Sequence, residues 1–205
     1  MPDLGAAADA PVFDAVVLAG GRGTRLGGAT KPEVVVGGRA LLDHALAAVR
    51  DAAHVVVVGP RTVARPGIPT VLEDPPDGGP VAGLAAGLAA IPDPSALVVV
   101  LACDVPRAGA ALPDLLRGAA GDGVDGARLV GAEGRPQHLV AVYWSAALRS
   151  ALARMPSVHG ASMRALVAGM VLVDVPDTDG SSADADTWPD VERLDAELNA
   201  ERIDP

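Results

Sequence analysis

Residues 15–31 read Ala-Val-Val-Leu-Ala-Gly-Gly-Arg-Gly-Thr-Arg-Leu-Gly-Gly-Ala-Thr-Lys, an apolar run that passes directly into a glycine-rich, basic loop. A strand that ends in such a loop can cradle phosphate, because glycines let backbone N–H groups converge on an anion. Arg22, Arg25 and Lys31 add compensating positive charge. The loop lacks the Gly-Lys-Ser/Thr of a Walker A motif, and Leu26 stands where a Rossmann fingerprint needs its third glycine. The stretch therefore predicts a binding site for a phosphorylated ligand that uses neither of these two motifs.

Apolar β-rich runs alternate along the chain with helical segments rich in alanine and leucine. The predicted strands are 12–18, 54–58, 70–72, 97–102, 127–130, 138–143 and 171–175, and the predicted helices are 40–50, 81–91, 188–199 and two that begin at Ser145 and Ala161. The strand at 97–102 is apolar throughout, as a central parallel strand must be when helices cover both faces. The alternation predicts an α/β fold with a three-layer, Rossmann-like open sheet, mainly parallel, and helices on both faces.

Length and charge narrow the class of protein. The 205 residues suit one domain, and segments 1–10 and 176–185, rich in small and polar residues, are expected to be mobile. The net charge of −10 argues against nonspecific binding to nucleic acid or to an anionic membrane. A loop with three cations and no carboxylate is therefore a local exception, which is what an anion-binding site requires.

Cys103 is the single cysteine, so an internal disulfide and a cysteine-based metal site are both excluded. The first ten residues contain no basic residue and do not resemble a secretory signal. No apolar stretch approaches the roughly 20 residues that span a bilayer. These features predict a soluble cytoplasmic protein.

Two aspartates are candidate metal ligands. Asp104 follows the strand at 97–102, at the sheet edge where the glycine loop also lies, and ligands of open α/β sheets bind at that edge. A carboxylate that faces a triphosphate there suits Mg²⁺, although Asp104 could instead cap the turn before Pro106. Asp186 precedes Thr187, which is predicted to cap the last helix with Asp190. Asp186 is either a second oxygen ligand or only a residue at a helix start.

Several motifs, in this order, resemble those of the MobA-type nucleotidyltransferases, which are molybdenum cofactor guanylyltransferases. They are Leu18-Ala19-Gly20-Gly21, Arg25-Leu26-Gly27, Lys31, Glu73-Asp74, Gly79-Pro80-x-x-Gly83, Ala102-Cys103-Asp104-x-Pro106 and Asp186-Thr187. The leading loop alone fits any nucleotidyltransferase of this superfamily. Segments 134–139 and 162–166 favour the MobA type, and the likeness runs from about residue 12 to residue 198.

The resemblance implies that GMP is transferred from GTP to molybdopterin with release of pyrophosphate. It implies one domain at 11–200, with a nucleotide-binding half at about 11–106 and an acceptor-binding half at about 107–200. Lys31 and Arg25 would neutralise the triphosphate, and Asp104 and Asp186 would bind Mg²⁺. The residues that would hold the nucleotide are Leu18, Ala19, Gly20, Gly21, Lys31, Asp74 and Asp104. Transient partners would be proteins that deliver molybdopterin or mature molybdoenzymes.

Three other interpretations share these residues. A molybdopterin cytidylyltransferase would keep the fold, the loop and the metal. A nucleotidyltransferase for another small phosphate acceptor would keep them as well. A catalytically silent nucleotide-binding or partner-binding protein would keep the fold without the activity, although Lys31, Arg25 and Asp104 are all present and give no sign of decay. Arg135 and Arg164 are candidate contacts for the acceptor phosphate, and Cys103 is predicted to be a structural residue.

Overall fold

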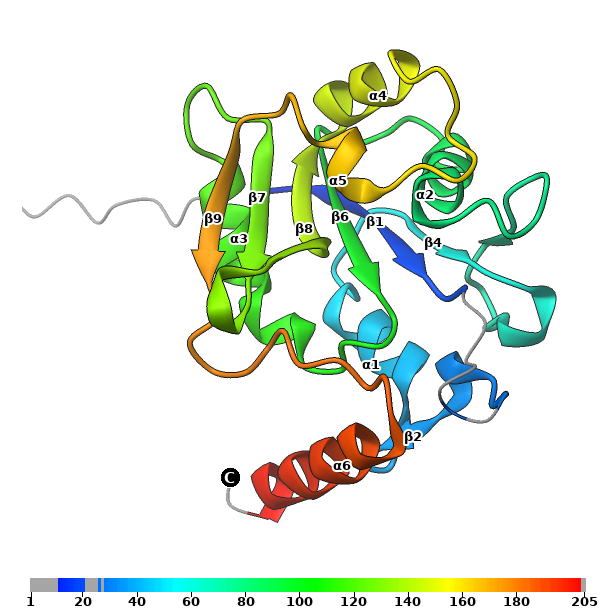
Figure 1. Ribbon diagram of the computed structural model, residues 1–205, viewed down its shortest axis with the longest axis vertical. Coiled ribbons are helices and arrows are strands. Elements are labelled where there is room, and N and C mark those ends of the chain that lie inside the picture. The colour runs from blue at the N-terminus through cyan, green and yellow to red at the C-terminus, as the bar shows by residue number, and fades with distance from the viewer. Residues whose placement is uncertain (1–10, 21–25, 27, 204–205) are drawn as a thin grey trace, which may run out of the picture.

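A seven-stranded sheet forms the centre of the molecule in the computed structural model, which describes all residues except 1–10, 21–25, 27 and 204–205 (Figure 1). Its strand order is β5 (Thr70–Val71), β4 (Val55–Val58), β1 (Phe13–Leu18), β6 (Leu97–Ala102), β8 (Pro136–Trp144), β7 (Gly126–Val130) and β9 (Leu172–Pro176). Only β8 runs antiparallel to its neighbours in this sheet. The predicted open, mainly parallel sheet is confirmed, whereas the predicted tail at 1–10 lies outside the described residues.

Helices cover both faces of this sheet. The helices α1 (Leu41–Ala48) and α3 (Leu112–Ala119) pack on one face. The other face is covered by α2 (Pro80–Ala89), α4 (Ser145–Ala153) and α5 (Met163–Leu166). Figure 1 shows α5 in front of the strands and α3 behind them. Two apolar cores result, one on each side of the sheet, so the central strands are apolar on both faces.

A third, smaller core lies away from the sheet. The hairpin of β2 (Val35–Val36) and β3 (Arg39–Ala40) packs against α6 (Trp188–Ile203) through a cluster that includes Leu41 and Leu194. Figure 1 shows α6 beside β2, outside the sheet layers. The hairpin and α3 were not expected from the sequence, and the helix expected from Ala161 is the single turn α5. Among the described helices, none is both long and apolar enough to cross a bilayer.

The helix α2 approaches the sheet so closely that only glycine fits at one position. A Cβ atom added to Gly87 would lie 2.6 Å from Val16 Cγ1 and 2.9 Å from Val58 Cγ2. Atoms of this kind do not approach closer than van der Waals contact without a shift of the backbone. The close approach holds α2 against the ends of β1 and β4.

Replacing Gly87 by alanine tests this packing. In a helix interior, Gly→Ala is normally stabilising by about 1 kcal/mol. We expect Gly87→Ala instead to lower the free energy of unfolding by about 1–2 kcal/mol, because the new methyl group overlaps Val16 and Val58. Gly169→Ala is the control, since a Cβ at Gly169 meets no atom within 4 Å. Urea unfolding measures both, and a Gly87→Ala protein as stable as the parent would contradict the packing argument.

Candidate active site

The carboxyl ends of three neighbouring strands are locked together at one edge of the sheet. The N–H of Ala19 donates to the carbonyl of Val58 at 2.7 Å, and the N–H of Cys103 donates to the carbonyl of Leu18 at 3.0 Å. Ala19 and Cys103, the residues that follow β1 and β6, are therefore held at the same edge. This geometry brings Asp104 to the edge that carries the glycine loop, as the sequence predicted.

A cavity of about 360 Å³ opens at this edge. Its lining residues are Leu18, Gly20, Lys31, Val58, Glu73, Asp77, Gly79, Pro80, Gly83, Ala102, Cys103, Asp104 and Leu139. Four of the predicted site residues, Leu18, Gly20, Lys31 and Asp104, are among them, and Ala19 is buried beneath. Gly21 and Arg25 lie outside the described residues. Asp74 is exposed and does not line the cavity, whereas its neighbour Glu73 does.

Lys31 joins the two predicted metal ligands. Its ammonium group donates to Asp104 Oδ2 at 2.7 Å and also to Asp186 Oδ1. The Lys31 side chain is only 15% exposed. Burial disfavours its charged form, but the hydrogen bonds to both carboxylates outweigh this and raise its pKa. Lys31, the one lysine in the sequence, is therefore a firmly charged cation at neutral pH.

A second ion-pair network holds the turn that carries Lys31. The 3-10 helix η2 (Lys31–Glu33) has proline at its second residue and ends at Glu33. Arg65 Nη1 and Nη2 contact the two Glu33 carboxylate oxygens at 2.9 and 3.1 Å, and Arg65 Nε contacts Asp43 of α1 at 2.7 Å. Paired contacts of this kind fix orientation as well as distance. Arg65 thus ties η2 to α1.

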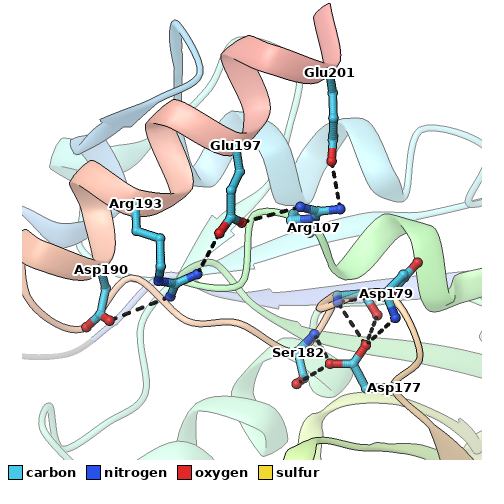
Figure 2. Close-up of polar contacts among 9 residues, drawn as sticks. Arg107, Asp177, Asp179, Ser182, Asp190, Arg193, Glu197 and Glu201 are labelled. Carbon is cyan, nitrogen blue, oxygen red and sulfur yellow. Dashed lines mark hydrogen bonds and ion pairs between the residues drawn. The ribbon is translucent and has the colours of Figure 1, made fainter. Parts of the chain in front are cut away.

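Asp186 reaches the site at the end of a well-ordered segment. The segment at 176–185 was expected to be mobile, yet Asp177 organises it into a compact turn (Figure 2). The Asp177 carboxylate accepts hydrogen bonds from five donors: the N–H of Asp179, and the N–H and hydroxyl groups of Ser181 and Ser182. Partial burial opposes the charge on Asp177, but these donors hold its pKa far below the usual range.

The same segment is attached to the loop that carries Asp104. The N–H of Ala185 donates to the backbone carbonyl of Asp104 at 2.9 Å, and Ala185 is fully buried in the third core. A third carboxylate, Asp184, interacts with the same group of charges. Burial, followed by repulsion from Asp186 and Asp104, raises the pKa of Asp184. Three carboxylates therefore concentrate negative potential around a single ammonium group.

The start of α6 is fixed by a capping box. Thr187 N and Oγ1 donate to Asp190 Oδ2 at 3.0 and 2.6 Å, and Asp190 N is 3.4 Å from Thr187 Oγ1. This confirms the predicted cap. Arg193 then contacts Asp190 and Glu197 (Figure 2).

Arg107 links the body of α6 to the loop after β6. Its guanidinium lies 3.4 Å from Glu197 Oε2 and 2.7 Å from Glu201 Oε1 (Figure 2). Because Arg107 follows Asp104 by three residues, this contact holds α6 against the loop that carries Asp104.

Cys103 lines the cavity without being a nucleophile. The residue is 3% exposed, and burial raises the pKa of its thiol to about 12. A neutral thiol is a poor nucleophile at pH 7. Cys103 therefore acts as a small apolar residue, as predicted.

The cavity also has features that the sequence patterns did not single out as binding groups. The first turn of α2 faces it through Gly79, Pro80 and Gly83. Gly79 has φ of 85°, a conformation that glycine adopts readily, and Pro80 then starts the helix. The Gly-Pro pair was the available signal, because glycine before an N1 proline is typical of a helix start.

A basic group lies on the far half of the chain. Arg128 of β7 contacts Asp174 Oδ1 at 2.7 Å. Burial, followed by the charges of Arg128 and Arg164, lowers the pKa of His138. Nδ1 of His138 is buried and has no hydrogen-bond partner among the described residues. Arg128 is therefore paired with a carboxylate and the lowered pKa favours neutral His138, beside Leu139, which lines the cavity.

Comparisons with known proteins agree with this geometry. Residues 15–175 match the family described as the MobA-like NTP transferase domain. Molybdenum cofactor guanylyltransferase of Acidiphilium cryptum is 34% identical over 192 residues, which cover 89% of this chain and 93% of that protein.

Two solved structures share the fold. Molybdopterin-guanine dinucleotide biosynthesis protein A from Archaeoglobus fulgidus has a TM-score of 0.70 and 22% identity, covering 92% of this chain and 100% of that one. The 2-C-methyl-D-erythritol 4-phosphate cytidylyltransferase from Thermus thermophilus has a TM-score of 0.66 and 25% identity, covering 91% and 98%. The predicted nucleotidyltransferase fold is confirmed.

Asp177→Asn tests the turn that leads to Asp186. We expect it to lower the free energy of unfolding at pH 7 by about 1–2 kcal/mol, because an amide has one acceptor oxygen in place of two. The pKa of Asp177 is lowered by folding, so its stabilisation is complete above about pH 5 and is lost as the pH falls below about 4. The difference between variant and parent should therefore shrink in acid.

Urea unfolding between pH 3 and pH 7 measures the effect. Asp122→Asn is the matched control, because Asp122 is exposed and makes no hydrogen bond or ion pair among the described residues. A difference between Asp177→Asn and parent that is independent of pH would contradict the assigned role of the charge.

Proposed function

Because the chain belongs to the MobA-like NTP transferase domain family, we propose that it transfers GMP from GTP to molybdopterin and releases pyrophosphate. The observation that carries this proposal is the buried Lys31 ammonium between Asp104 and Asp186 at the mouth of the cavity. The name of the Acidiphilium cryptum relative supports guanine and molybdopterin as the substrates.

The reaction needs alignment and charge neutralisation more than covalent help. An oxygen of the acceptor's terminal phosphate attacks the α-phosphorus of GTP, and the bond from that phosphorus to the bridging oxygen of the β-phosphate breaks. Lys31 is the cation assigned to the charge that develops on the departing pyrophosphate. The backbone of Leu18 and Gly20 is assigned to orient the nucleotide. Arg25 is assigned a supporting role at the triphosphate.

The two aspartates also fit a divalent cation. Within the described part of the chain no group of three or more His, Cys, Asp or Glu side chains could hold a metal alone. Asp104 and Asp186 already have oxygens directed at one cation, Lys31, and Mg²⁺ commonly uses one or two carboxylates with waters and substrate phosphates. We propose these two residues as its ligands. Bound there, Mg²⁺ would neutralise phosphate charge and help to align the reacting groups.

The setting of the reaction follows from the substrates. We propose that the enzyme works in the cytoplasm and makes transient contact with proteins that supply molybdopterin or receive the finished cofactor. Arg135 and Arg164 are the proposed contacts for the acceptor phosphate. A cytidylyltransferase is the second candidate, because the Thermus thermophilus enzyme of that class shares the fold.

Pyrophosphate release tests the proposal. With Mg²⁺ and molybdopterin, GTP should support release and CTP, ATP and UTP should not. Lys31→Ala should reduce turnover with GTP by about 100-fold or more, because it removes charge stabilisation from the transition state.

Arg50→Ala is the matched control for loss of a cation, since the Arg50 side chain is 80% exposed and does not line the cavity. It should keep the parent's turnover. Release with CTP alone would replace guanylyl by cytidylyl transfer, and no release with any nucleotide would sink the proposed reaction.

A further inference from the structure

Glu73 places an unpaired carboxylate in the wall of the cavity. The residue follows β5 and is half-buried, and it lines the cavity together with Leu18 and Val58. Among the described residues the Glu73 carboxylate makes no hydrogen bond or ion pair. Asp77 also lines the cavity, but it is already engaged in an interaction. Glu73 is therefore an acceptor that is accessible to a ligand with hydrogen-bond donors.

The position of this carboxylate is defined by the first turn of α2. Glu73 Oε2 lies 3.8 Å from where a Cβ of Gly83 would stand, and that same point is 3.3 Å from Val58 Cγ1 and 3.6 Å from Leu18 Cδ2. A side chain at Gly83 would be tight against Val58, so Gly83 packs closely here and leaves the Glu73 carboxylate beside the apolar side chains of Val58 and Leu18 in the cavity wall. Apolar walls with few polar groups suit the faces and edge of a planar base.

This end of the cavity is distinct from the end that carries Lys31. Two strands, β4 and β1, separate β5 from β6 in the sheet. Lys31 attracts the triphosphate, whereas the Glu73 carboxylate, which has no cation paired with it among the described residues, repels the phosphates. The group that meets Glu73 is therefore the base or the ribose and not the phosphates.

We infer that Glu73 selects guanine by accepting hydrogen bonds from its N1–H and N2–H groups, an inference that rests on the proposed use of GTP. Guanine presents these two donors side by side, which matches the two oxygens of an acceptor-only carboxylate. Cytosine and adenine each offer an amino group next to a ring acceptor, and uracil offers one N–H between two carbonyls. Glu73 is thus a specificity residue, and it does not touch the reacting atoms.

The test is equilibrium binding of GTP, ITP, 2′-deoxy-GTP and CTP by calorimetry with Mg²⁺ and without acceptor. ITP keeps N1–H but lacks the N2 amino group, so it isolates one of the two contacts. We expect the parent protein to bind GTP about tenfold or more tighter than ITP or CTP. In Glu73→Gln the preference for GTP over ITP should fall to within about threefold, because the amide N–H₂ opposes the donors of guanine.

The ratio of affinities is the readout, because loss of a negative charge alters the binding of every triphosphate alike. Glu192→Gln is the matched control, since Glu192 is exposed on α6 and should keep the parent's ratio. An unchanged ratio of GTP to ITP in Glu73→Gln would overturn the inference. If Glu73→Gln instead changed the ratio of the affinities for GTP and 2′-deoxy-GTP and left the ratio for GTP and ITP unchanged, Glu73 would contact the ribose and the inference would be overturned.

Failure of this inference can be told apart from failure of the proposed function. If GTP bound selectively through Glu73 but no pyrophosphate were released, the proposed transferase reaction would be contradicted and the proposed base contact would be supported. Pyrophosphate release from GTP with the same preference over ITP in parent and Glu73→Gln would leave the reaction standing and remove the base contact.

Discussion

One buried ammonium group holds the site together. Lys31 donates to Asp104 and to Asp186, which come from the loop after β6 and from the segment before α6. These three pieces of chain belong to different layers of the molecule, and without the cation their carboxylates would repel one another at close range. The surrounding contacts, from Arg65 on Glu33 to Arg107 on Glu197, serve to keep each piece where this one cation can reach it.

The third core exists to support that arrangement. The hairpin β2–β3 is too short to be stable alone, and α6 does not pack on the sheet. Both bury apolar side chains in one cluster that also takes in Leu26, Leu41 and Ala185, and the segments that carry Lys31 and Asp186 lead into the hairpin and into α6. A local cluster of apolar contacts thus stabilises the geometry of the charged groups, and the chain keeps its only lysine for this place in a protein of net charge −10.

Local patterns in the sequence were sufficient for the features that depend on neighbouring residues. The alternation of apolar runs predicted the sheet, the continuous run at 97–102 predicted its central strand, and the spacing of Thr187 and Asp190 predicted the cap of α6. Contacts between distant residues were not predictable in this way. The hairpin depends on α6 for its stability, and composition alone made the segment at Asp177 look mobile, although its hydrogen bonds order it. Glu73 and Asp74 are adjacent acids in a loop without periodicity, so only the structure distinguishes which of them faces the cavity.

The carboxylates in the cavity and in the segment before α6 have different roles because they have different partners. Asp177 is saturated by donors from its own turn, so it can only be structural. Asp104 and Asp186 share a cation, so their place is with phosphate and metal charge. Glu73 has neither donors nor a cation among the described residues, yet it lines the cavity beside Leu18 and Val58. A ligand that displaces water from this carboxylate must replace the lost hydrogen bonds with donors of its own, and the donor edge of guanine is such a group.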